Sequence, residues 1–178
     1  MPVEEKAYSV VAEAKTIMDS LKERYPSVLW TVDPSKVVVL GVTNKEPPEP
    51  KPGKLKTNAK IRKINGSIAA LLEYYKVPIK YVIELYYSDW QGWSNARRQW
   101  ILLHELSHIP ALDEGGLIKH DVQDFSFILD AVGVDWTNSS ILPDLLDGEP
   151  VKFNEALVTR LHMQPEYEEA GVGAEAEL

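Results

Sequence analysis

The sequence predicts one α+β domain with a mostly antiparallel sheet. Two runs, "SKVVVLGV" and "IKYVIELYY", are rich in β-branched and aromatic residues and have the length of strands. Apolar residues at helical spacing precede the first run and follow the second. A length of 178 residues and a hydrophobic share of 44% suit a single domain with a sizeable core. We expect this domain to span residues 1–163.

The first half of the chain is expected to hold a helix, two strands and a short second helix. Between Val10 and Tyr25 apolar residues recur three and four positions apart, and Pro26 ends that helix. The strand "SKVVVLGV" follows. Segment 58–64, "NAKIRKI", alternates apolar and basic side chains, as a half-exposed strand does. Segment 66–76, "GSIAALLEYYK", is typical of a short helix that a proline soon stops.

The second half is expected to hold one strand and two helices. The strand is "IKYVIELYY", the strongest strand pattern in the sequence. Ser94 is a candidate N-cap for a helix over residues 95–109, and Pro110 forbids its continuation. After a glycine-containing loop, a second helix is expected over residues 119–132, with Gly133 as its C-terminal cap.

The composition excludes several classes of site. The chain has no cysteine, so disulfides, thiolate catalysis and cysteine-based zinc clusters are ruled out. Histidine and carboxylate remain as strong metal ligands. The N-terminus carries two glutamates where a secretory signal needs positive charge, and no apolar run approaches the roughly 18 residues of a membrane span. We therefore expect a cytoplasmic protein without a membrane partner.

The charge is unevenly distributed. The net charge of −8 argues against a nucleic-acid partner. Residues 164–178 contain five acidic and no basic residues, which predicts a solvated acidic tail, although a glutamate from it could reach and block a metal site. Residues 45–56 form a proline- and lysine-rich connector. Its lysines indicate a solvated loop, with a phosphate-tracking surface as the alternative. The sequence does not indicate whether the protein is a monomer or an oligomer.

The stretch "WILLHELSHIPALDEGGLIKHDVQDF" holds three of the four histidines. His104 and His108 lie four residues apart on a predicted helix, so their Cβ atoms are about 5–6 Å apart and both rings can reach one ion. Glu105 is rotated by about 100° from His104, which suits a general base that reaches a water rather than a third ligand. The alternative is a histidine pair bonded to backbone at a packed interface. The apolar back of the helix and the nearby third histidine favour a metal site.

The third ligand is predicted to be His120. The spacing of the metzincin motif fails, because Ala111 replaces its glycine and Glu114 stands at its histidine position. Glu114 or Asp113 could coordinate instead, as carboxylates do in other zinc sites. His120 is favoured because it opens a predicted helix with an apolar stripe that would anchor it. That stripe consists of Val122, Phe125, Leu129 and Val132.

Two aspartates are candidates for orienting the third histidine. Asp124 lies four residues after His120, on the same side of the predicted helix, and could bind its other ring nitrogen. Asp121 is a second candidate. The alternative for both is a favourable negative charge at a helix N-terminus.

The blocks "WILLHELSHIP" and "KHDVQDFSFILDAVGVDW", with the loop between them, resemble the putative phage metallopeptidase family, which is itself similar to SprT-like zincins. The resemblance covers roughly residues 56–136. It implies a small zincin fold, one catalytic Zn²⁺ and hydrolysis of peptide bonds. By position, His104, His108 and His120 match the zinc ligands and Glu105 matches the general base. The natural substrate is not implied beyond a peptide or protein.

The resemblance also places "KYVIELYY" as the edge strand above the cleft, with the substrate extended beside it. In the implied mechanism, zinc activates a water, Glu105 takes its proton, and the leaving amine receives it. His162 and the tyrosines of that strand are expected to be packing residues, with oxyanion stabilisation as the alternative. A non-catalytic zinc protein, or a protein-interaction module that retains the fold, is the alternative function.

Overall fold

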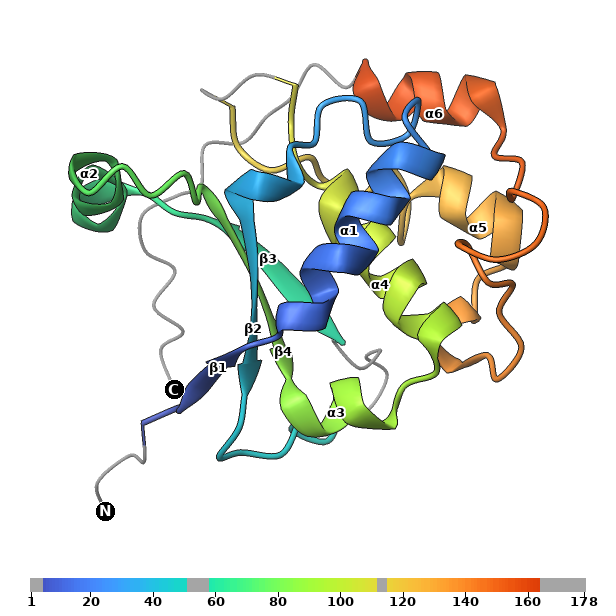
Figure 1. The fold of residues 1–178 in the computed structure, drawn as a ribbon. Helices are drawn as coiled ribbons and strands as arrows, with labels where there is room; N and C mark the ends of the chain where they lie inside the picture. Colours follow the sequence, from blue (N-terminus) through green and yellow to red (C-terminus); the bar gives the residue numbers. More distant parts are fainter. Residues whose placement is uncertain (1–4, 51–57, 112–114, 164–178) are drawn as a thin grey trace.

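The computed structural model describes residues 5–50, 58–111 and 115–163, which form a four-stranded sheet with the larger helices on one face (Figure 1). The strand order is β1 (Tyr8–Val10), β2 (Val37–Val42), β4 (Tyr81–Tyr86), β3 (Ala59–Lys63). The central pair, β2 and β4, is parallel, whereas β1 and β3 run antiparallel to their neighbours. The α+β class is confirmed, and the sheet is mixed, with two antiparallel pairings and one parallel pairing.

The expectation that "KYVIELYY" forms the edge strand is wrong. Strand β4 pairs with β2 on one side and with β3 on the other, so β3 is the edge strand at this end of the sheet. The exposed Lys60 and Arg62 suit β3 to an edge, because charged side chains discourage further pairing. In β4 every second side chain is buried, which suits a sheet that is covered by helices on one face.

Helices α1 (Ala12–Arg24) and α4 (Asn95–Ser107) pack against each other and form the main layer on the sheet (Figure 1). The predicted cap of α4 is confirmed, since the Ser94 hydroxyl accepts the N–H of Arg97 at 3.2 Å. The core between helices and sheet includes Met18, Leu21, Val39, Ile83, Leu102 and Leu103. Eight of the thirteen residues of α4 are buried, so a polar side chain on this helix lies close to the core.

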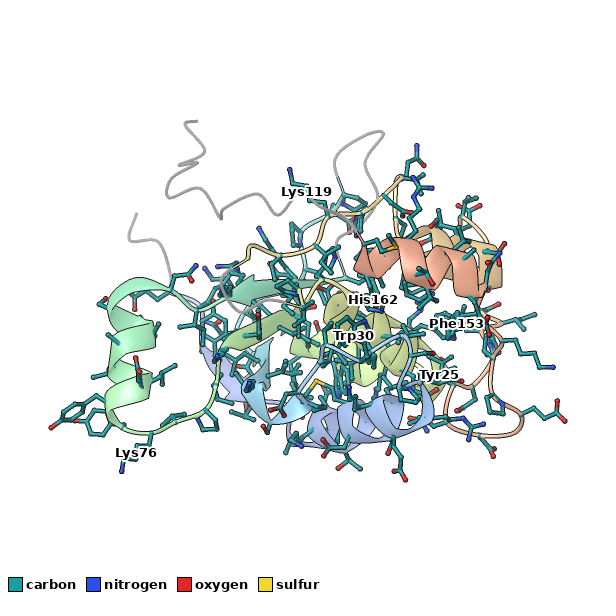
Figure 2. The ribbon with its side chains drawn as sticks, turned by 90° about the horizontal axis from the view of Figure 1, so that it is seen from above. Tyr25, Trp30, Lys76, Lys119, Phe153 and His162 are labelled. Atoms are coloured by element: carbon teal, nitrogen blue, oxygen red, sulfur yellow. The ribbon has the colours of Figure 1, made fainter. Side chains whose placement is uncertain are left out.

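The remaining elements surround this core. They are the 3₁₀ helices at Pro34–Lys36 and Trp136–Asn138 and the helices α2 (Gly66–Tyr74), α3 (Tyr87–Gly92), α5 (Ser126–Val132) and α6 (Glu155–His162). Helix α2 stands away from the body and buries none of its residues, and Lys76 just beyond it points outward (Figure 2). Across the described ranges, no helix is long and apolar enough to cross a bilayer.

The helix predicted over residues 119–132 is much shorter than expected, because α5 begins only at Ser126. The Asp121 carboxylate accepts hydrogen bonds from the backbone N–H and the hydroxyl of Ser126, at 2.8 and 2.5 Å. Asp121 thus binds the first residue of α5 from a position outside the helix, whose N-cap residue is Phe125. Val122, placed in the apolar stripe by the prediction, is 55% exposed. The predicted end is confirmed, since Gly133 closes α5 with a φ of +82°.

Two predicted segments are described only in part or not at all. Residues 45–50 of the connector contain no helix or strand, and its remainder lies outside the described residues. The acidic tail, residues 164–178, also lies outside them, so the division of the chain at residue 163 stays a prediction.

Candidate metal centre

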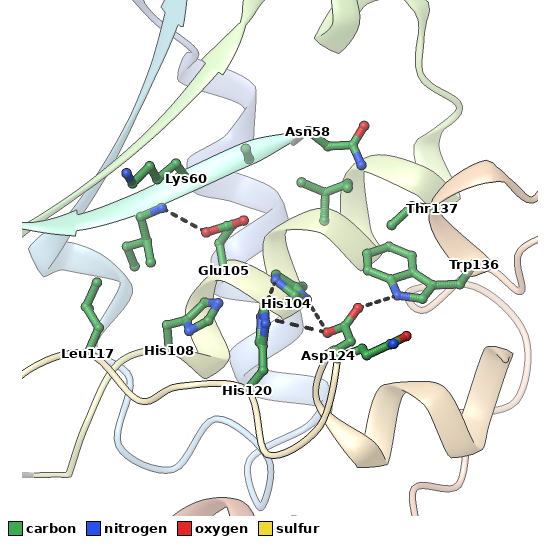
Figure 3. A pocket seen from close by; sticks show the side chains of 14 residues that line it. Asn58, Lys60, His104, Glu105, His108, Leu117, His120, Asp124, Trp136 and Thr137 are labelled. Atoms are coloured by element: carbon green, nitrogen blue, oxygen red, sulfur yellow. Dashed lines mark hydrogen bonds and ion pairs between the residues drawn. The ribbon is translucent and has the colours of Figure 1, made fainter. Parts of the chain in front are cut away.

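Helix α4 and the loop that leads to α5 bring three histidines together (Figure 3). His104 lies on α4, His108 is the C-cap residue of that helix, and His120 approaches from the loop. One donor nitrogen from each ring lies within 4.8 Å of the others. The Nε2 atoms of His104 and His120 are 3.2 Å apart. Three imidazole nitrogens gathered in this way are a suitable donor set for one metal ion.

The ring of His108 is held by the loop residue Ile118. Its Nδ1 lies 2.5 Å from the Ile118 carbonyl, and the Ile118 N–H donates to the His108 carbonyl at 2.7 Å. Because a carbonyl can only accept, Nδ1 carries the proton and Nε2 keeps its lone pair for a metal. Burial, with a smaller contribution from neighbouring His104, lowers the pKa of His108 to about 3. No sequence pattern indicated this role for Ile118.

The ring of His104 is held by Asp124. Its Nδ1 lies 2.9 Å from Asp124 Oδ1, an ion-pair contact that is not well directed enough to satisfy this nitrogen as a hydrogen-bond donor. Burial would lower the pKa of His104, but the carboxylates of Asp124 and Glu105 raise it above its ordinary value. The contact leaves Nε2 facing the other two histidines (Figure 3).

Asp124 therefore serves a different histidine from the one predicted. Its Oδ1 lies 4.0 Å from His120 Nε2, against 2.9 Å from His104 Nδ1. The prediction assumed helical geometry, and residues 119–125 are not helical. The described contacts of Asp121 are with Ser126 and, at 3.8 Å, with Arg160, so Asp121 places a negative charge at the N-terminus of α5, which is the alternative considered for it.

The Asp124 carboxylate is itself held by two donors. Oδ1 accepts the N–H of Phe125 at 2.6 Å, and Oδ2 accepts the indole N–H of Trp136 at 2.8 Å. Burial would raise the pKa of Asp124, but His104, Trp136 and the Phe125 amide hold it below its usual value. Asp124 is thus an ionised side chain with defined partners on both oxygens.

Phe125 forms an apolar support beneath the three histidines. Its ring centroid lies 5.4, 4.7 and 4.9 Å from those of His104, His108 and His120, and it is 1% exposed. The periodicity identified Phe125 as buried but not as a neighbour of the site. Its closeness in sequence to His120 was the only available signal.

Glu105 is buried beside the histidines, with 5% of its surface exposed. Its Oε2 accepts the backbone N–H of Ile61, on β3, at 2.8 Å. Burial raises the pKa of Glu105, and this is only partly offset by His104 and the Ile61 amide. A carboxylate with a raised proton affinity next to a candidate metal centre suits a general base.

The site opens into a cavity of about 370 Å³ between β3, α4 and the loop before α5 (Figure 3). Besides the histidines, Glu105 and Asp124, its lining includes Asn58, Leu117, Gln123 and Thr137. Glu114 and Asp113, the alternative ligands, lie outside the described residues. His162 lines a different cavity, where its ring lies beside Trp30 (Figure 2).

The fold and the site define a small α+β protein with a three-histidine centre next to a buried glutamate. The family model described as "Putative phage metallopeptidase" matches residues 6–144, and the chain belongs to this family. The predicted resemblance is confirmed, over a longer segment than expected. Membership implies a metal ion and a peptide or protein substrate. No curated protein and no solved structure gives a match.

Proposed function

We propose that this protein is a zinc-dependent peptidase in which His104, His108 and His120 hold one zinc ion and Glu105 is the general base. The observation that carries the proposal is the convergence of three imidazole donors, within 4.8 Å of one another, beside a buried carboxylate. In two of the rings, Nδ1 already has a partner, which leaves Nε2 for a metal.

The donor set fits zinc. Neutral imidazole is a common zinc ligand, and three protein ligands with an open position are typical of catalytic sites, whereas structural sites use four. Within the ranges that the structure describes, the group contains three histidines and no fourth side chain. When bound, zinc supplies Lewis acidity, which lowers the pKa of a water and polarises the scissile carbonyl.

Glu105 moves the proton in the proposed reaction. Its carboxylate accepts a proton as the water attacks the peptide carbonyl, and then delivers that proton to the leaving amine. The Ile61 amide fixes Oε2, so Oε1 is the oxygen that the described contacts leave for the water. Burial supports this role because it raises the proton affinity of the carboxylate.

The edge strand β3 offers a place for the substrate. The Ile61 N–H points away from β4. In an antiparallel strand, the backbone N–H and C=O groups of residues two positions apart point to the same side. The backbone groups of Ala59 therefore face the same side as those of Ile61, and both residues line the cavity. A substrate in extended conformation would add to this edge as a further strand.

The test is Glu105→Gln, with zinc content and cleavage of an unstructured protein such as casein measured on the same samples. The amide keeps the size of the side chain but cannot take the proton, so we expect unchanged zinc and a rate loss of about 10²–10⁴. Glu73→Gln, on the exposed helix α2, is the matched control and should change neither the zinc content nor the cleavage rate. Cleavage by Glu105→Gln at the wild-type rate would exclude the mechanism.

A further inference from the structure

A chain of three side chains runs from the core to the candidate metal centre. The indole N–H of Trp136 donates to Asp124 Oδ2 at 2.8 Å, and Asp124 Oδ1 contacts His104 Nδ1 at 2.9 Å (Figure 3). Trp136 begins the short 3₁₀ helix after α5, twelve residues beyond Asp124. The carboxylate is therefore fixed by an element of the fold outside its own loop.

Trp136 is well placed to be the rigid end of this chain. It is 2% exposed, and its ring lies between those of Trp100 and His104, with centroid distances of 6.4 and 5.8 Å. A tightly packed indole cannot follow a moving partner, so its N–H selects one orientation of the carboxylate. Without that donor, Oδ2 would be a partly buried charge that must find a new partner by rotating away from His104.

We propose that Trp136 is a positioning residue for the metal centre, which acts through Asp124 to fix the ring of His104. The inference rests on the proposed metal site. It adds to that site a residue from outside α4 and outside the loop that carries His120. Removing the indole N–H should then weaken metal binding, because partners behind a ligating histidine set its orientation and basicity.

The experiment measures zinc affinity of the full-length protein by competition with a chromophoric chelator. For Trp136→Phe we expect about a tenfold loss, at the low end of the ~10–100-fold range for residues behind a metal ligand. Another buried tryptophan is the matched control. Trp90 is 0% exposed, and its indole N–H donates to Glu13 at 2.8 Å. Trp90→Phe loses the same N–H and ring area and should keep wild-type affinity within about twofold.

A double-mutant cycle separates positioning from packing. If Trp136 acts through Asp124, then Trp136→Phe should cost no further affinity in an Asp124→Ala background. The same loss in both backgrounds, or an equal loss in Trp90→Phe, would show that only general packing is involved and would overturn the inference. Wild-type zinc affinity in Trp136→Phe would overturn this inference but not the proposed function. Absence of zinc binding by the wild-type protein would overturn the proposed function as well.

Discussion

At the scale of single residues, the site shows which roles a sequence can predict. His104 and Glu105 lie on α4 and His108 is its C-cap residue, still in helical conformation, so their spacing is enough to place them together. The contacts that hold these side chains could not be predicted in this way. Ile118 and Ile61 contact His108 and Glu105 through a backbone carbonyl and a backbone amide, and Trp136 donates its indole N–H to Asp124, all at positions that depend on tertiary packing. No local pattern encodes such contacts.

The identity of the third ligand is a prediction at this scale. His120→Ala should reduce zinc affinity by more than the ~10–100-fold typical of residues behind a ligand, because a donor is lost outright. Glu114→Ala should keep one zinc per chain. The measurement is metal content after gel filtration, with folding checked by circular dichroism. Unchanged zinc in His120→Ala together with a loss in Glu114→Ala would reverse the assignment.

At the scale of elements, periodicity predicted α1, α4 and the strands β2, β3 and β4 well, because their apolar faces are buried against one another. It missed β1, whose residues Tyr8–Val10 are exposed, and placed Val10 in the first helix. It failed over residues 119–125. Those residues carry enough apolar side chains to resemble a helix, but Asp121 bonds to the backbone of Ser126 and delays the helix start. The edge position of β3 was also missed, because strand order is set by long-range pairing and not by the pattern within one strand.

The contact between Asp121 and the start of α5 can be tested by substitution. Asp121→Ala removes the acceptor for the Ser126 N–H, so it should lower the free energy of unfolding of the metal-free protein by about 1 kcal/mol. Asp130→Ala, at an exposed position of the same helix, is the control and should stay within about 0.5 kcal/mol of wild type. Denaturant-induced unfolding measures both. Equal effects of the two substitutions would show that the Asp121 contact does not stabilise the start of the helix.

At the scale of the whole molecule, the candidate metal centre joins the buried helix α4 to the loop that leads to α5. His104 belongs to α4 and His108 is its C-cap residue, whereas His120 belongs to a loop without regular structure. An ion bound to all three would fasten that loop to the core. Because it binds the folded state, it would also raise the free energy of unfolding.

Removal of the metal tests this link. At a free zinc concentration of 100 times Kd, binding should add about 2.7 kcal/mol of stability, which corresponds to a Tm higher by about 5–10 °C for a chain of this size. The measurement compares thermal unfolding with zinc and with a chelator. His104→Ala serves as the control, since its Tm should be the same under both conditions. A wild-type Tm that does not respond to zinc would contradict the link.

The hydrogen bond from the Ile61 N–H to Glu105 determines which substitutions in β3 leave the carboxylate in place. The donor is a backbone amide, which every amino acid except proline carries, so the anchor of the carboxylate does not depend on the side chain at position 61. Packing alone restricts that side chain, which is 4% exposed. If Glu105 is the proposed general base, substitutions along β3 would therefore alter which polypeptides fit beside the strand without changing the alignment of the Glu105 carboxylate.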